Sequence, residues 1–139
     1  MRISYSLCSL LAAFTLLLPA LKAQTTPSAD PKSISVVDAG LGPCTADFIV
    51  NDSAGSPVYA ATVRVHIAYG FMSAHKLDLE AGTNAAGKTR FIGLPEQTKH
   101  GLFFRVSEGN REASAFDDPA KTCKANFTLA LRKSSNDNQ

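Results

Sequence analysis

Large apolar residues in this chain recur at every second position. In the clearest run, Val63, Val65 and Ile67 alternate with charged or polar residues. An extended strand points successive side chains to opposite faces, so this pattern indicates strands with one buried face. No long segment carries the uninterrupted three-to-four spacing of an amphipathic helix. The alternation therefore restricts the chain to an all-β fold.

Several other segments alternate in the same way, and clusters of Gly, Asn, Asp and Ser that favour turns separate them. About seven short strands at this spacing predict a two-sheet antiparallel β-sandwich. Residues 107–110 are expected to close a hairpin with a loop of about four residues. The positions expected to face one common core are Val63, Val65, Ile67, Phe91, Leu102, Phe104, Val106, Phe127 and Leu129.

The N-terminal segment has the composition of a secretory signal peptide. Arg2 precedes an apolar run over 7–18, and small residues lead up to Ala23. The run is shorter than the roughly 20 residues of a membrane helix, and no second one follows. This predicts a secreted or periplasmic protein with no membrane insertion after signal cleavage. The expected organisation is a signal peptide at 1–23, a flexible leader at 24–32, the sandwich at 33–132 and a disordered tail at 133–139.

The charge of the chain limits its partners. The sequence contains 14 Lys and Arg residues and 12 Asp and Glu residues. Arg2 and Lys22 leave with the expected signal peptide, so the mature chain is neutral. Nucleic acids and anionic membranes both select a basic excess. We therefore expect no nucleic acid to bind, and no anionic membrane as the main partner.

Two cysteines, Cys44 and Cys123, remain once Cys8 is removed with the signal peptide. An even pair in an exported chain indicates a disulfide. Each cysteine stands just before an apolar run, at 46–50 and at 125–131. A Cys44–Cys123 bond would therefore join the starts of two strands that are neighbours or that face each other across the sandwich.

Two segments have a more specific pattern. Residues 48–65 have the pattern of a strand, followed by a turn with Gly55, a Pro57-Val58 pair and small residues that lead into a second strand. Residues 83–95 read as a threonine, a turn ending in Gly87, and an aromatic strand that stops at glycine-leucine-proline. Together, over residues 48–106, they resemble carboxypeptidase regulatory-like domains, which are related to transthyretin-like and prealbumin-like sandwiches.

The chain departs from that family in two places. The stretch 69–82 is longer and more polar than the family's connection, and Asn84 stands where an aspartate is common. Members of the family pack beside catalytic domains, tile surface proteins or occur alone in exported bacterial proteins. The resemblance therefore implies a non-catalytic accessory domain with a structural or protein-binding role, an envelope or extracellular protein as its partner, and no cofactor.

The alternative is a small carbohydrate-binding module. Tyr69, Phe71 and Met72 fall in a segment expected to be an exposed loop. Flat rings on such a loop can stack on sugars or fill pockets, which makes these residues a candidate ligand loop. The competing interpretation is that they fold back and cover the end of the core.

Patterns typical of catalysis or metal binding are missing. His66 is expected on the polar face of its strand, and His75 and His100 are expected in loops, so no two share a ligand spacing. The nucleophile pattern G-x-S-x-G is absent, as is the C-terminal Tyr-Arg-Gly-Ser of transthyretin-like hydrolases. Asp117-Asp118 could bind calcium together with the Asn51-Asp52 turn, but aspartates before a proline favour a turn. We expect neither an enzyme nor a metal site.

Overall fold

The computed structural model describes residues 30–134, and the expected signal peptide lies outside the described residues. Within that range the chain forms nine strands and one short 3-10 turn. The elements are β1 (Ser35–Asp38), β2 (Cys44–Asn51), β3 (Thr62–Tyr69), η1 (Phe71–Ser73), β4 (His75–Gly82), β5 (Lys88–Leu94), β6 (Leu102–Glu108), β7 (Arg111–Asp117), β8 (Lys124–Ala130) and β9 (Arg132–Lys133). None of the described residues belongs to a helix long and apolar enough to cross a membrane.

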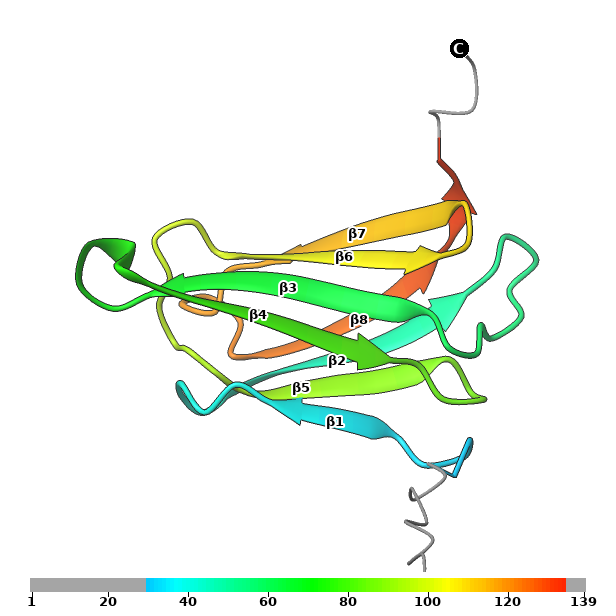
Figure 1. Ribbon diagram of the computed structural model, residues 1–139, viewed down its shortest axis with the longest axis horizontal. Coiled ribbons are helices and arrows are strands. Elements are labelled where there is room, and N and C mark those ends of the chain that lie inside the picture. Colours follow the sequence, from blue (N-terminus) through cyan, green and yellow to red (C-terminus); the bar gives the residue numbers. More distant parts are fainter. Residues whose placement is uncertain (1–29, 135–139) are drawn as a thin grey trace, which may run out of the picture.

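The strands form two layers (Figure 1). One sheet has four strands in the order β1-β5-β2-β8, and the other has five in the order β4-β3-β6-β7-β9. This confirms the predicted two-sheet β-sandwich. The sheets are not wholly antiparallel, because β1 is parallel to β5 and β8 is parallel to β2. Apolar alternation fixes which face a strand buries but not its direction, so the sequence pattern did not show these two pairings.

The core lies between the sheets and is centred on three phenylalanines. Phe48 and Phe91 come from the four-stranded sheet and Phe104 from the five-stranded sheet, and all three are at most 1% exposed. Their ring centroids lie 4.9–5.9 Å apart, as expected for packed aromatic rings. Seven of the nine predicted core residues are buried, whereas Phe127 and Leu129 are only partly buried because β8 is the edge of its sheet.

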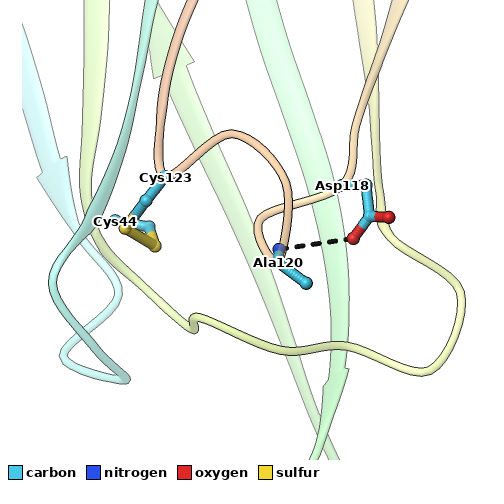
Figure 2. The surroundings of a disulfide bond; sticks show 4 residues. All are labelled: Cys44, Asp118, Ala120 and Cys123. Carbon is cyan, nitrogen blue, oxygen red and sulfur yellow. Dashed lines mark hydrogen bonds between the residues drawn. A yellow bond between two sulfur atoms is a disulfide. The ribbon is translucent and has the colours of Figure 1, made fainter.

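Cys44 and Cys123 form the expected disulfide, with their Cα atoms 4.5 Å apart (Figure 2). The two cysteines stand at the starts of the parallel neighbours β2 and β8, where Thr45 faces Lys124 in the register. The turn before Cys123 is held by Asp118, whose carboxylate accepts a hydrogen bond from the Ala120 N–H at 3.3 Å (Figure 2). The adjacency of the two strands is therefore confirmed.

The segment 69–82 is a hairpin tip followed by a strand rather than a polar loop. Strand β4 pairs with β3 along its full length, from Thr62 opposite Gly82 to Tyr69 opposite His75. His75 therefore begins a strand, contrary to the expectation that it lies in a loop. The turn between β6 and β7 is also tighter than expected, because Glu108 pairs with Arg111 and only two residues lie between them. Gly109 permits this turn with its positive φ of 57°.

Residues on both sides of the expected 33–132 span also contact the sandwich. The side-chain amide of Asn84 donates to the carbonyl of Lys32 at 3.0 Å, and the Ala85 N–H donates to the carbonyl of Pro31 at 2.7 Å. At the other end, β9 pairs with β7 through Arg132 and Lys133. The fold therefore takes in part of the expected leader and the first residue of the expected tail.

Candidate functional site

A groove of about 620 Å³ lies on the outer face of the five-stranded sheet. Most of the strand residues that line it point away from the core, because they alternate with the buried residues of β3 and β6. Its volume is in the range of about 300–1,000 Å³ that is typical of small-molecule sites. The lining is formed by Arg64, His66, Asp78, Glu80, Phe103 and Arg105, together with the loop residues 98–101.

Two side-chain pairs join β3 and β4 at the groove. The Arg64 Nε donates to Glu80 Oε2 at 2.7 Å, and His66 Nδ1 lies 2.6 Å from Asp78 Oδ1. Both pairs consist of residues directly opposite each other in the antiparallel register. All four side chains are more than half exposed, so each pair contributes at most about 1 kcal/mol to folding.

The contact with Asp78 also orients the His66 ring. An ionised carboxylate can only accept hydrogen bonds, so the Nδ1 of His66 must carry the hydrogen that it donates to Asp78. In the neutral ring this leaves Nε2 with a free lone pair. His66 can therefore accept a proton at Nε2 from water or from a molecule held in the groove.

Two cations of the groove have no ionic partner. The ion pairs among residues 30–134 include neither Arg105 nor Lys99. The guanidinium carbon of Arg105 lies 5.8 Å from the centroid of the Phe103 ring, which is a cation–π distance. With His66 neutral, Arg64, Lys99 and Arg105 outnumber Asp78 and Glu80, so the net charge of the groove is positive.

An apolar surface adjoins these cations. Phe103 and Phe116 stand opposite each other in the β6–β7 register and are 49% and 58% exposed. The Phe116 ring lies against the backbone of Gly101, where an added Cβ would come within 2.5 Å of its Cζ atom. Gly101 itself lines the groove. The site therefore combines a flat aromatic surface with a free guanidinium and a free ammonium group.

A second hollow of about 760 Å³ lies on the other side of Arg105. It shares Arg64, Phe103 and Arg105 with the groove and extends to Arg132 and Lys133. Across the two hollows, five Lys and Arg side chains face three Asp and Glu side chains. This face is therefore locally basic, although the mature chain as a whole is expected to be neutral.

The loop that closes one end of the groove contains an unsatisfied hydroxyl. Thr98 Oγ1 is buried and has no hydrogen-bond partner, and it is the one buried side-chain polar atom in residues 30–134 with this property. Buried hydroxyl groups usually have a partner. The loop 98–101 is thus the part of the lining whose polar groups are least satisfied.

The residues of the candidate ligand loop differ in burial. Tyr69 is partly buried and packs against the core, with its ring centroid 5.4 Å from that of His75. Phe71 and Met72 are instead 88% and 83% exposed at the tip of the hairpin. None of the three lines either hollow of the outer face. The structure therefore separates Tyr69 from the two residues with which it was expected to bind sugars.

The histidines and aspartates do not assemble a metal centre. His66 and His100 both line the groove, whereas His75 does not. Asp118 lies in the turn before Cys123 (Figure 2), and the Asn51-Asp52 turn lies at the other end of β2. Burial raises the pKa of the Asp117 carboxyl, and the charge of Asp118 raises it further. No group of three or more potential metal ligands occurs within residues 30–134.

Sequence analysis missed the groove because it treated the polar positions of the strands as a solvated face. The signal that could have been used is the adjacent pair Phe103-Phe104. Consecutive residues of a strand point to opposite faces, so placing Phe104 in the core requires Phe103 to lie outside, next to Arg105. An exposed phenylalanine beside an arginine marks a candidate binding surface.

No protein-family model and no curated protein sequence matches this chain. Among solved structures, it is similar to 3-chlorocatechol 1,2-dioxygenase from Rhodococcus opacus 1CP, with 14% identity and a TM-score of 0.47 over 78% of this chain and 68% of that one. It is also similar to catechol 1,2-dioxygenase from Pseudomonas arvilla C-1, with 14% identity and a TM-score of 0.48 over 76% of this chain and 60% of that one. A 9R-lipoxygenase from Cyanothece PCC8801 matches with 13% identity and a TM-score of 0.43, over 70% of this chain and 18% of that one.

The dioxygenases among these matches are enzymes, which disagrees with the predictions of a non-catalytic accessory domain and of a chain that is not an enzyme. The carbohydrate-binding alternative stays untested; its three residues lie outside both hollows of the outer face. The likeness to the dioxygenases concerns the sandwich fold alone, and it transfers neither a substrate nor a reaction to this chain. The resemblance to carboxypeptidase regulatory-like domains stays a prediction.

Proposed function

We propose that the outer face of the five-stranded sheet binds a small anionic molecule with a flat apolar part, of which an aromatic carboxylate is the simplest example. The observation that carries this proposal is the position of Arg105. Its guanidinium lies over the exposed Phe103 ring, borders both hollows and has no acidic partner among the described residues.

The chemistry of the groove supports an anion rather than a cation. A guanidinium presents two parallel N–H donors to a carboxylate, and Lys99 adds a second positive charge at the same groove. Phe103 and Phe116 offer rings on which a flat apolar group can stack. Glu80 is paired with Arg64, and Asp78 accepts a hydrogen bond from His66, so both carboxylates are engaged by side chains of β3.

The test is a titration of the ¹⁵N-labelled chain with 2-naphthoate, followed by NMR. Shifts are expected in β3, β6 and the loop 98–101. Replacing Arg105→Gln removes a charge-assisted contact, so we expect binding to weaken by about 10- to 100-fold. Arg90→Gln is the matched control, because Arg90 is paired with Asp47 on the other sheet. The uncharged analogue 2-naphthalenemethanol is expected to bind weakly. Equal binding of both compounds, or no effect of Arg105→Gln, would contradict the proposal.

A second candidate function is hydrolysis of an ester that carries such a carboxylate, and the His66–Asp78 pair favours it. His66 Nε2 would take a proton from water as the water oxygen bonds to the ester carbonyl carbon. Collapse of the tetrahedral adduct breaks the bond to the alcohol oxygen, which receives the proton back from His66. Asp78 stabilises the imidazolium formed in between.

This second function is tested with 4-acetoxybenzoate, whose hydrolysis releases 4-hydroxybenzoate and acetate. Loss of a general base should lower turnover by about 100-fold or more, so His66→Asn is expected to abolish most activity. Binding of 2-naphthoate by the same variant should persist, because Arg105 and Phe103 remain. His75→Asn serves as the control, since His75 lies outside the groove lining. Equal turnover by the His66→Asn variant and the wild type would exclude the role of His66.

A further inference from the structure

The tip of the β3–β4 hairpin presents two large apolar side chains to solvent. Phe71 is 88% exposed and Met72 is 83% exposed, whereas the next most exposed large hydrophobic residue among those described, Tyr59, reaches 59%. Both belong to η1, none of whose residues is buried. An isolated pair of this kind differs from the ordinary scatter of half-exposed apolar residues on a soluble protein.

The backbone of the tip holds these side chains outward. Met72 and Ser73 have φ values of 53° and 56°, in the left-handed region that residues with a side chain seldom adopt. The Ser73 N–H donates to the carbonyl of Gly70 at 3.1 Å, and the Ala74 N–H donates to that of Phe71 at 3.2 Å. The turn is therefore closed by its own hydrogen bonds, and it does not fold back over the core.

The base of the tip is fixed to the sandwich. Tyr69 and His75 are paired at the end of the β3–β4 ladder, with their rings 5.4 Å apart. Gly70 lets the chain pass this ring pair, since a Cβ there would lie 2.9 Å from the His75 ring. The exposed pair thus projects from a packed platform at one end of the molecule (Figure 1).

Basic residues occur beside the tip in the chain and in a loop at the same end of the molecule. His75 and Lys76 follow it in β4, and Lys99 and His100 lie in the loop between β5 and β6 at the same end (Figure 1). Neither Lys76 nor Lys99 takes part in an ion pair among the described residues. The segment 70–77 contains no acidic residue, and Glu96 is the one acidic residue of the 95–101 loop. These two segments together carry two lysines and one glutamate, so their net charge is positive.

We infer that this end of the sandwich docks on an anionic lipid surface, with Phe71 and Met72 inserted among the acyl chains. Two side chains are too small an area for a stable protein interface, which buries about 800 Å² on each partner. A lipid surface requires no complementary shape, and it favours apolar side chains flanked by Lys and His next to anionic headgroups. Membrane insertion was not expected from the sequence, because the chain has no second apolar run long enough to span a membrane and no overall basic charge. Insertion of a two-residue tip requires neither feature.

The test uses flotation of the mature chain with vesicles of phosphatidylcholine mixed with phosphatidylglycerol. The wild type is expected to float with these vesicles. The double variant Phe71→Ser/Met72→Ser should lower the partition coefficient by about tenfold or more, because both apolar side chains are lost. Tyr59→Ser is the matched control, since Tyr59 is 59% exposed in the loop before β3, at the opposite end of that strand from the tip. Lys76→Glu should also weaken binding, whereas equal flotation of the double variant would overturn the inference.

A second measurement does not depend on affinity. The chain contains no tryptophan, so the tryptophan fluorescence of a Met72→Trp variant reports on the tip alone. Anionic vesicles should shift this emission to the blue, and brominated lipids should quench it. An unshifted, unquenched emission on vesicles that carry the protein would overturn insertion. Self-association of the wild type without vesicles, lost in the double variant, would show that a second copy covers the tip and would also overturn the inference.

Discussion

Cys44 and Cys123 are bonded at the point where β2 and β8 begin side by side, so one covalent link fixes the register of two strands far apart in sequence. The bond closes a separation of 79 residues. Its effect on stability follows from the chain entropy that this closure removes from the unfolded state.

For the double variant Cys44→Ala/Cys123→Ala, the free energy of unfolding should fall by about 4.5 kcal/mol, as chain entropy predicts for a loop of this length. Small domains have only about 5–15 kcal/mol in total, so the variant should be close to unfolded at ambient temperature. Urea unfolding of both proteins measures the difference. The wild type should also have an intact mass about 2 Da below that of its reduced form. A loss of less than about 1 kcal/mol would mean that the strands keep their register without the bond.

Phe104 should be among the residues most sensitive to truncation. It is fully buried between Phe48 and Phe91, so Phe104→Ala should cost about 3–5 kcal/mol of unfolding free energy. Arg64→Ala, on the opposite face of the neighbouring strand β3, removes only an exposed ion pair and should cost about 1 kcal/mol or less. Similar melting temperatures for the two variants would contradict the assigned faces.

Two buried hydroxyls provide a contrasting pair. Thr83 Oγ1 accepts from the Ala61 N–H at 2.9 Å and donates to the Val58 carbonyl at 2.6 Å. Thr83→Val leaves both backbone groups unpaired and should cost about 1–3 kcal/mol. Thr98→Val removes a hydroxyl that has no partner, so it should leave stability unchanged or raise it. Thermal unfolding of the two variants tests this difference, and a loss of stability in Thr98→Val would show that Thr98 does make a hydrogen bond.

The raised pKa of the Asp117 carboxyl predicts how the free energy of unfolding depends on pH. Burial and the neighbouring Asp118 raise its pKa above the ordinary value of 3.8, so the folded chain binds the proton more tightly than the unfolded chain. The stability gained from this proton is complete below pH 3.8 and is lost as the pH rises through the raised pKa. The Asp117→Asn variant has no carboxyl at this position, so it does not lose stability in this way as the pH rises.

Relative to the wild type, Asp117→Asn should therefore unfold at a higher temperature at pH 7, and the difference should vanish in acid below pH 3.8. Unfolding curves recorded across this range measure the effect. Glu112→Gln, a change at an exposed position of the same strand, should show no such trend. An Asp117→Asn variant that is less stable than the wild type at neutral pH would contradict the assignment.

The sequence was sufficient to predict the elements that depend on local pattern. Val63, Val65 and Ile67 marked β3, and the cysteine pair marked the contact between β2 and β8. The groove depends instead on how strands align. His66 meets Asp78, and Phe103 faces Phe116, only because of the cross-strand register. A one-residue slip would exchange the outer and inner faces, and alternation alone does not determine which residues of different strands become neighbours.

The order of strands in the four-stranded sheet has a consequence for how the chain folds. Strand β2 lies between β5 and β8, both of which follow it at long range in the sequence. Its neighbour β8 ends at Ala130, so β2 has no partner along one edge until almost the whole domain has been synthesised. Non-local pairing of this kind slows folding and leaves an apolar strand edge exposed in the meantime. The early part of the chain therefore keeps an unpaired strand edge until its last strands are in place.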